Sequence, residues 1–316
     1  MSSRGKIRAL LATLRIANAP SVVSNVFLGW MLGVALAIDS DVYGVVSRLP
    51  FLVCLAGLLL YFAGNLANDW FDRSWDEQRR PERALPSGLF KPGSYLAASL
   101  LCASVGCILA FRESLACGVC ALGILACIAI YTRYHKQAIW AVIPMGLCRA
   151  GLYALGMASI LQDPRAAGEL GAEPWKFALG NWITLAPYAL GLFCYIAGLS
   201  LSARYEGMEN APPGPRLISK CLIAFPLLAM PCLTMPGWPV MSLLGMIPFA
   251  MWLALSFTRY AKPIPAYVSA LLAGIPLVDL IALTPIAWWE GKLEFLAVPL
   301  VAFVTGRALQ KLAPAT

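Results

Sequence analysis

The segment 68–76 carries Asn68, Asp69, Asp72 and Asp76 directly after a long apolar run. In a helix these side chains would share one face, because residues three and four positions apart are neighbours. Two carboxylates about 6 Å apart repel by about 3 kcal/mol at an effective dielectric of about 20, so folding alone does not favour the arrangement. A hard divalent cation does, because Mg²⁺ takes oxygen ligands and is commonly shared with substrate phosphates. We predict that these four residues bind Mg²⁺ and that the three aspartates are catalytic.

Basic residues follow the aspartates at once. Residues 79–88 read RRPERALPSG, and the planar donors of a guanidinium group match phosphate oxygens well. Arg80 and Arg83 are therefore predicted to bind phosphate. The alternative is that they only mark the cytoplasmic side of a membrane, where Lys and Arg accumulate. An acidic cluster followed by a basic one predicts a metal–diphosphate site.

A second candidate group is the segment 131–136, which reads YTRYHK. Lys136 is predicted to contact the diphosphate, and Tyr131 to assist a departing diphosphate oxygen. The alternative is that both residues anchor the chain at the rim of a bilayer. His135 is the single histidine of the chain, which argues against a histidine-based metal site.

Two charged residues, Arg149 and Asp279, fall inside apolar segments. A charge in the middle of a membrane costs about 2.5–3.5 kcal/mol on insertion scales, so such residues usually face a cavity or a partner. Both are predicted to line a substrate cavity. The alternative is that Arg149 and Asp279 pair with each other and are structural.

The composition is that of a polytopic membrane protein. Of 316 residues, 60% are hydrophobic and only 13% are charged, and the mean hydropathy is +0.73, whereas soluble domains carry about 25% charged residues. The net charge of +8 is therefore expected to follow membrane topology, and no nucleic-acid partner is predicted. Most of the ten cysteines lie in apolar runs, and the pair Cys117 and Cys120 is interpreted as buried hydrophobic packing.

Ten apolar segments approach the roughly 20 residues that a helix needs to cross a bilayer. Most of the 24 Lys and Arg residues fall between them on one side, which predicts that both chain ends are cytoplasmic. We expect an all-α integral membrane protein with one domain over 1–316, in a bacterial inner membrane, and long inner loops at 68–92 and 201–216. The predicted spans are 17–38, 49–67, 93–111, 115–132, 138–161, 182–200, 217–235, 239–257, 265–288 and 293–307.

These motifs resemble those of the UbiA family of intramembrane prenyltransferases. The family pattern NDxxDxxxD followed by RPxRxLPSG matches residues 68–76 and 80–88. The segment 131–136 is similar to the family's Tyr/Lys segment, and 146–156 is similar to its fifth helix. The resemblance implies a bundle of about nine to ten transmembrane helices around a central cavity. It also implies Mg²⁺ on two Asp-rich motifs holding a polyprenyl diphosphate, whose allylic carbocation alkylates an acceptor.

The second Asp-rich motif of the family, DxxxDxEGD, is degenerate in this chain. Aligned on Glu206 and Gly207, its aspartates fall at Leu201, Arg204 and Met208. Glu206 is then the acid that remains in register and is predicted to bind substrate, and Arg204 is predicted to touch the diphosphate in place of a cation. The pattern resembles a divergent branch whose acceptor is a cyclitol-like or polar ring rather than 4-hydroxybenzoate. The predicted acceptor is therefore an aromatic or a cyclitol-like ring.

The resulting prediction is an Mg²⁺-dependent transfer of a polyprenyl group to a small ring acceptor within the lipid bilayer. A phosphatase or a cyclase acting on prenyl lipids could use the same metal site. A non-catalytic relative that transports or carries lipid is the other alternative, suggested by the degenerate second motif.

Overall fold

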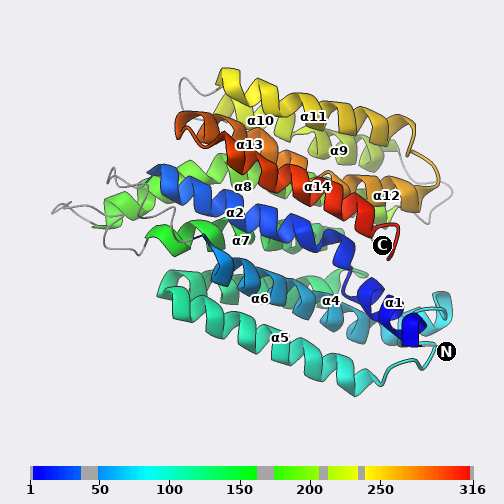
Figure 1. Ribbon diagram of the computed structural model, residues 1–316. Helices are drawn as coiled ribbons and strands as arrows, with labels where there is room; N and C mark the ends of the chain where they lie inside the picture. Colours follow the sequence, from blue (N-terminus) through cyan, green and yellow to red (C-terminus); the bar gives the residue numbers. More distant parts are fainter. Residues whose placement is uncertain (1–2, 37–48, 162–173, 206–212, 234–238, 314–316) are drawn as a thin grey trace.

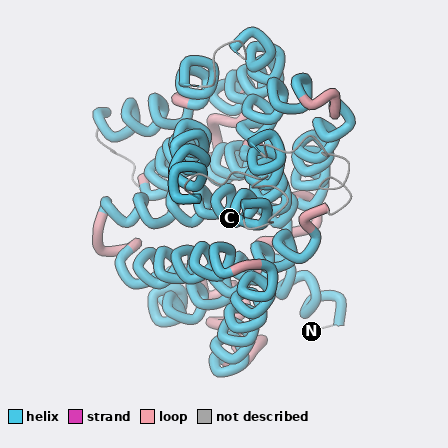
Figure 2. The backbone as a smooth tube through the Cα atoms, turned by 90° about the vertical axis from the view of Figure 1, so that its left-hand side faces the viewer, coloured by secondary structure: helices cyan, strands magenta, loops and turns pink. Residues whose placement is uncertain are grey.

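The computed structural model describes residues 3–36, 49–161, 174–205, 213–233 and 239–313, and these residues form helices and connecting turns without a β-strand (Figures 1 and 2). The helices run side by side in one bundle, and both chain ends lie at the same end of it (Figure 1). The predicted all-α membrane fold is therefore confirmed. In chain order the helices are α1 (Ser3–Thr13), η1 (Ile16–Asn18), α2 (Ala19–Leu36), α4 (Phe51–Arg79), α5 (Pro92–Glu113), α6 (Leu115–Tyr134), η2 (Ile139–Ala141), α7 (Val142–Leu161), α8 (Pro174–Arg204), α9 (Pro213–Ala224), α10 (Pro226–Leu233), α11 (Pro239–Thr258), α12 (Ile264–Ala273), α13 (Ile275–Trp289), η3 (Leu293–Leu296) and α14 (Ala297–Leu309).

Within the described residues, 7 helical segments are long and apolar enough to cross a membrane. They correspond to predicted spans one to six and nine, the last of which combines α12 and α13 over Ile264–Trp289. The predicted spans at 217–235 and 293–307 form shorter helices, whereas the span predicted at 239–257 falls on α11, which has 20 residues. The span predicted at 217–235 breaks into α9 and α10 where Pro226 begins a new helix, because proline lacks the N–H that would continue the ladder.

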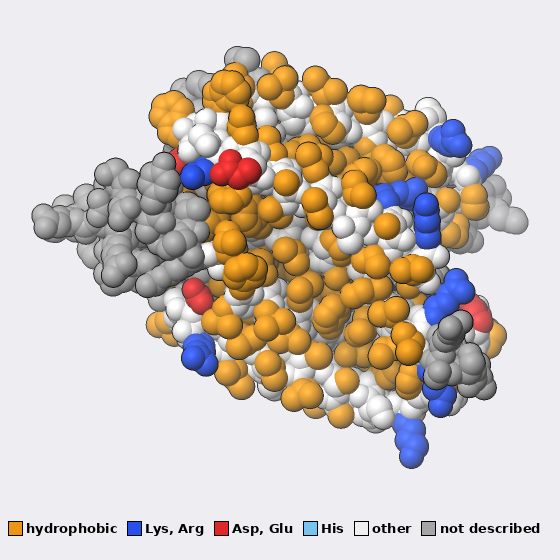
Figure 3. Space-filling model, in the orientation of Figure 1, with side chains coloured by type: hydrophobic (Ala, Val, Ile, Leu, Met, Phe, Trp, Pro, Cys, Tyr) orange, Lys and Arg blue, Asp and Glu red, His pale blue; other side chains and the backbone are white. Residues whose placement is uncertain are grey.

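Apolar side chains cover most of the face shown in Figure 3, and Lys and Arg gather mainly at the end where both chain termini lie in Figure 1. Leu101, Ile108 and Val304 are among the large apolar residues that remain exposed. In a soluble protein such a surface would aggregate. It suits a bundle whose middle faces hydrocarbon and whose ends face water.

Helix α2 packs against α7, α13 and α14 and is almost entirely buried. Its crossing with α7 is close because glycines face the partner backbone on both helices. A Cβ atom on Gly29 would lie 2.0 Å from the carbonyl oxygen of Tyr153, and one on Gly156 would lie 2.0 Å from that of Val26. Small residues commonly permit such close helix contacts in membranes.

Two helices extend beyond the predicted spans. Helix α4 has 29 residues, about 44 Å at 1.5 Å per residue, which exceeds a hydrocarbon core of about 30 Å. The predicted inner loops at 68–92 and 201–216 are therefore wrong in their first parts, because α4 continues to Arg79 and α8 continues to Arg204. Asp69, Asp72 and Asp76 therefore lie on one face of the part of α4 that extends beyond the predicted span.

Candidate active site

The aspartates of the 68–76 segment lie on the last turns of α4, and each faces a basic partner. Asp72 and Asp76 are buried. Asp76 pairs with Arg83 (Oδ2 to Nη1, 2.9 Å), and Asp69 Oδ1 lies 3.7 Å from the same Arg83 nitrogen. Asp72 pairs with Lys136 through Oδ1 at 3.0 Å. The repulsion that the sequence predicts between the carboxylates is thus offset by surrounding cations.

Arg15 is the further partner of Asp69, with Nη2 3.7 Å from Oδ1. It lies at the bend between α1 and η1 in the left-handed backbone region, with φ 46°. Helix α4 holds this bend, because Tyr61 donates to the carbonyl oxygen of Arg15 at 3.0 Å and Asn65 donates to that of Leu14 at 3.0 Å. The backbone that positions Arg15 is therefore fixed by the helix whose carboxylate it contacts.

The turn after α6 brings His135 to Asp72 in addition to Lys136. His135 Nε2 lies 3.2 Å from Asp72 Oδ2, and the ring of Tyr131 stacks on that of His135 with centroids 4.9 Å apart. Lys136 Nζ lies 3.6 Å from the centroid of the Trp75 ring. Burial lowers the pKa of Lys136, and the Asp72 carboxylate opposes that shift.

Arg204, at the end of α8, binds the backbone of this turn. Its Nη1 donates to the carbonyl oxygens of His135 at 2.6 Å and Ala138 at 3.0 Å, and its Nη2 lies 3.5 Å from that of Lys136. Arg204 stands at a position where the resemblance leads one to expect an aspartate. It holds the turn that carries the groups facing Asp72.

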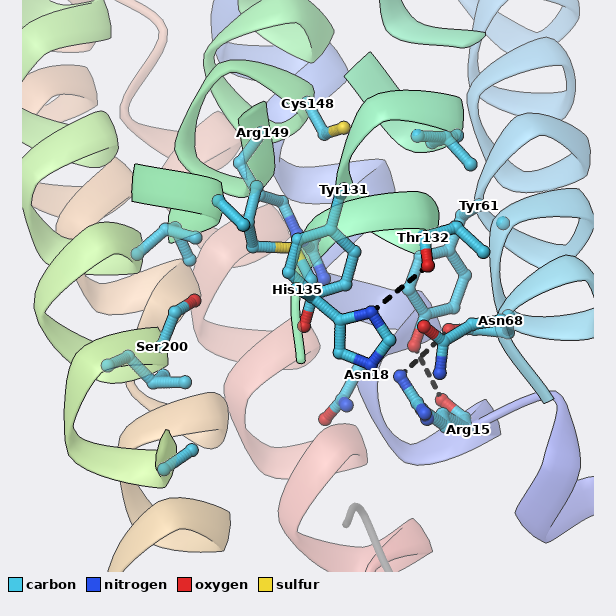
Figure 4. A pocket seen from close by; sticks show the side chains of 18 of the residues that line it. Arg15, Asn18, Tyr61, Asn68, Tyr131, Thr132, His135, Cys148, Arg149 and Ser200 are labelled. Carbon is cyan, nitrogen blue, oxygen red and sulfur yellow. Dashed lines mark hydrogen bonds between the residues drawn. The ribbon is translucent and has the colours of Figure 1, made fainter. Parts of the chain in front are cut away.

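A cavity of about 590 Å³ opens between these helices. Its mouth is polar, and Lys and Arg outnumber Asp among the lining residues that the structure describes. Its inner part is apolar, with Leu60, Ile128 and Leu199 among the lining side chains. In Figure 4, Tyr131 and His135 face the cavity between Asn68 and Arg15 on one side and Cys148 and Arg149 on the other.

The cavity brings together most, but not all, of the residues that the sequence singles out. Asp69 and Asp279 do not line it, and Glu206 lies outside the described residues. The predicted residues that line it are Asn68, Asp72, Asp76, Arg80, Arg83, Tyr131, Lys136, Arg149 and Arg204.

Asp279 belongs instead to a buried polar network beside the cavity. It accepts hydrogen bonds from Ser24 and Tyr153, each at 2.5 Å, and from Asn25 Nδ2 at 2.9 Å. Asn25 Oδ1 in turn accepts from Arg149 Nη1 at 3.2 Å. The considered pairing of Arg149 with Asp279 is therefore indirect, because Asn25 lies between them.

The oxygen atoms at the mouth fit a metal ion that is shared with a substrate. Within the described residues, no three His, Cys, Asp or Glu side chains form a group that could hold an ion by themselves, and all three aspartates are paired with Lys or Arg side chains. However, Asn68 Oδ1 and Asp76 Oδ1 are buried and accept no hydrogen bond from the described residues. Mg²⁺ is usually bound by one or two carboxylates together with waters and phosphates, so a closed cage of protein ligands is not required.

Sequence reasoning misses several residues at the site. From the sequence, Arg15 counts only as one of the basic residues that indicate the cytoplasmic side, and His135 only argues against a histidine-based metal site. In the structure both side chains contact the aspartates. The polar residues Ser21 and Asn25 within the first apolar segment were a usable signal. A polar side chain in a membrane span needs a partner inside the bundle.

Comparison with known proteins gives a family and a set of relatives. The UbiA prenyltransferase family matches residues 23–266. A digeranylgeranylglyceryl phosphate synthase of Natronomonas pharaonis is 28% identical over 187 residues, which cover 57% of this chain and 61% of the relative. Another, from Methanothrix thermoacetophila, is 40% identical over 73 residues, which cover 23% of this chain and 27% of the relative. The matches thus span less than two thirds of the length of these relatives.

Two solved structures share the fold at low sequence identity. One concerns digeranylgeranylglyceryl phosphate synthase in membranes, with a TM-score of 0.56, 14% identity, and coverage of 90% of this chain and 98% of that one. The other is a UbiA homologue from Archaeoglobus fulgidus bound to DMAPP and Mg²⁺, with a TM-score of 0.50, 14% identity, and coverage of 95% and 98%. Together with the match over most of its length, these findings mean that the chain is a multi-pass membrane protein of the UbiA prenyltransferase family.

Proposed function

We propose that this protein transfers a polyprenyl group from an isoprenoid diphosphate to an acceptor inside the membrane. The observation that carries the proposal is one continuous cavity that joins an acid–base mouth to an apolar interior. A prenyl diphosphate has the same two-part chemistry, with a charged head and a hydrocarbon tail. We propose further that the charged end of the bundle faces the cytoplasm of a bacterial inner membrane.

At the mouth, Asn68, Asp72 and Asp76 would hold Mg²⁺ together with the diphosphate. The bound ion would supply positive charge that polarises the phosphate oxygens. Arg83 and Lys136 already neutralise the carboxylates, and their remaining N–H donors can reach phosphate oxygens. These cations would stabilise the negative charge that develops on the departing diphosphate.

The interior would hold the hydrocarbon tail and exclude water from the allylic carbocation. Leu60, Ile124, Ile128 and Leu152 line this part and offer no nucleophile. Tyr131, which lines the cavity next to His135, would donate its hydroxyl proton to a diphosphate oxygen. The cation would then be captured by the acceptor, and the proton that the acceptor loses would return to the Tyr131 oxygen.

Two acceptor classes are proposed. The sequence pattern favours a small aromatic or cyclitol-like ring. The names of the relatives, digeranylgeranylglyceryl phosphate synthases, favour a prenylated glyceryl phosphate. The basic character of the cavity mouth supports an acceptor that carries negative charge.

The test is transfer by purified protein in nanodiscs with Mg²⁺. Labelled dimethylallyl, geranyl, farnesyl and geranylgeranyl diphosphates would be offered with aromatic, cyclitol and prenylglyceryl phosphate acceptors. Asp72→Asn should abolish transfer and weaken Mg²⁺-dependent diphosphate binding. Glu77→Gln, the same chemical change at an exposed position on α4, should leave both unchanged.

The outcomes separate the candidate functions. Product that requires Mg²⁺ and Asp72 supports a transferase, and release of diphosphate without an acceptor supports a phosphatase or cyclase. Absence of Mg²⁺-dependent diphosphate binding in the wild type would overturn the enzyme proposal and favour the lipid-carrier alternative.

A further inference from the structure

Arg149 carries a charge that no described residue neutralises directly. It is only 8% exposed, on α7. Its hydrogen bonds to described residues leave from Nη1 and reach neutral oxygens, Ser21 Oγ at 3.0 Å and Asn25 Oδ1 at 3.2 Å. No carboxylate of the described residues forms an ion pair with it.

The buried carboxylate of Asp279 is already occupied by other donors. Ser24, Asn25 and Tyr153 all donate to it. These bonds also fix the amide of Asn25, so that its Oδ1 faces the guanidinium of Arg149. The network therefore orients Arg149, and the Asp279 carboxylate reaches it only through Asn25 and forms no direct ion pair with it.

The cavity reaches this guanidinium. Arg149 lines the cavity beside Cys148 (Figure 4), and its Cζ lies 5.3 Å from the centroid of the Tyr61 ring. It lies seven residues into α7, which begins at Val142, and this is about 10 Å along the helix axis. The site is thus deeper than the mouth, where Arg83 and Lys136 are paired with aspartates.

A buried cation without a direct ion pair is costly, and in membrane proteins such a residue usually faces a substrate pathway. We infer that Arg149 is the binding site for an anionic oxygen group of the acceptor, a carboxylate or a phosphate, within the membrane-embedded part of the cavity. The inference rests on the proposed function. It excludes the diphosphate as the normal ligand, because the anchored guanidinium lies below the mouth.

The experiment compares anionic ligands with neutral counterparts of similar shape. The pairs are 4-hydroxybenzoate with 4-hydroxybenzamide, and geranylgeranylglyceryl phosphate with its dephosphorylated alcohol. Binding to the full-length protein in nanodiscs would be measured for the wild type, Arg149→Gln and Arg149→Lys. Arg112→Gln, the same change on the exposed end of α5, is the matched control.

The wild type should bind the anionic member of at least one pair about tenfold or more tightly than the neutral member, as a charge-assisted hydrogen bond predicts. Arg149→Gln should remove that preference, Arg149→Lys should keep part of it, and Arg112→Gln should keep all of it. The affinity for farnesyl diphosphate with Mg²⁺ should change little in the Arg149 variants. The pair that shows the preference identifies the carboxylate or the phosphate as the source of the anion.

Two results would overturn the inference. One is a wild type that binds neither anionic ligand better than its neutral counterpart. The other is a folded Arg149→Gln protein, judged by its melting curve, that retains the full preference. A wild type that does not bind farnesyl diphosphate at all would instead count against the proposed function, because that measurement does not involve the acceptor ligands.

Discussion

Arg204 Nη1 donates a hydrogen bond of 2.6 Å to the carbonyl oxygen of His135 and a second, of 3.0 Å, to that of Ala138. The end of α8 is thereby joined to the turn after α6. The same turn presents Lys136 to Asp72. A residue that replaces an expected metal-binding aspartate thus supports the first Asp-rich motif from across the cavity.

Arg204→Gln should weaken Mg²⁺-dependent binding of farnesyl diphosphate by about tenfold, because a charge-assisted hydrogen bond contributes about 1.5–3 kcal/mol. Arg204→Lys should be nearly as impaired, since one ammonium group cannot reproduce the planar fork that reaches two carbonyl oxygens. Equilibrium binding of labelled farnesyl diphosphate provides the measurement. Full affinity in Arg204→Lys would mean that the residue acts through its charge alone. Arg133→Gln, an exposed change on α6, serves as the control.

Arg80 and Arg83 should separate binding from stability. Arg83 contacts Asp76, whose side chain is only 3% exposed. Arg83→Gln therefore leaves a buried carboxylate unpaired and should reduce the free energy of unfolding by about 1–2 kcal/mol after allowing for solvent screening. We expect the melting temperature to fall by several degrees. Arg80 is exposed at the mouth of the cavity. Arg80→Gln should therefore weaken diphosphate binding without a comparable shift in melting temperature. Equal melting shifts for the two variants would contradict this assignment.

The glycines between α2 and α7 should be intolerant of any side chain. Gly29→Ala and Gly156→Ala each place a Cβ 2.0 Å from a backbone carbonyl oxygen, and such overpacking typically costs about 1–3 kcal/mol or more. Gly123→Ala on α6 meets nothing within 4 Å and should be neutral or stabilising by about 0.5–1 kcal/mol. Melting curves in detergent compare the three. A Gly156→Ala protein as stable as Gly123→Ala would rule out the close crossing.

Asp279 should matter more for folding than for diphosphate binding. Asp279→Leu leaves the donors of Ser24, Asn25 and Tyr153 without their acceptor, and each unsatisfied buried donor costs about 1–3 kcal/mol. Tyr153→Phe removes one donor and should be milder. Both variants are compared by melting temperature and by farnesyl diphosphate affinity. An Asp279→Leu protein with normal stability but no diphosphate binding would indicate a direct role for this carboxylate.

The residue pattern was sufficient to predict the helical face at 68–76, because the spacing of Asn68, Asp72 and Asp76 belongs to one short segment. The same pattern did not predict the residues at which α4 and α8 end. An apolar run marks where a chain leaves hydrocarbon, whereas a helix continues for as long as its polar residues find partners. Glutamate and arginine are good helix formers, so the helix passes the membrane boundary without a signal in hydropathy.

The long-range contacts were beyond the sequence for a different reason. Arg15 contacts Asp69, Arg204 contacts His135 and Asn25 contacts Asp279 only because distant helices pack together. Each of these residues has an ordinary local explanation, such as a topology marker or a tolerated polar side chain. No periodicity within a single segment distinguishes that explanation from the contact that the fold creates.

The polar residues of α2 can form their hydrogen bonds only after α13 has been synthesised. Ser24 and Asn25 find their common acceptor 255 and 254 residues later in the chain, on α13. Because a protein is synthesised from its N-terminal end, the first span is made long before that acceptor exists. Until the ribosome has made α13, the side chains of Ser24 and Asn25 lack the Asp279 acceptor, either within the bilayer or while shielded by an insertion factor. Chains that stop before this helix should therefore be recognised as incomplete and degraded.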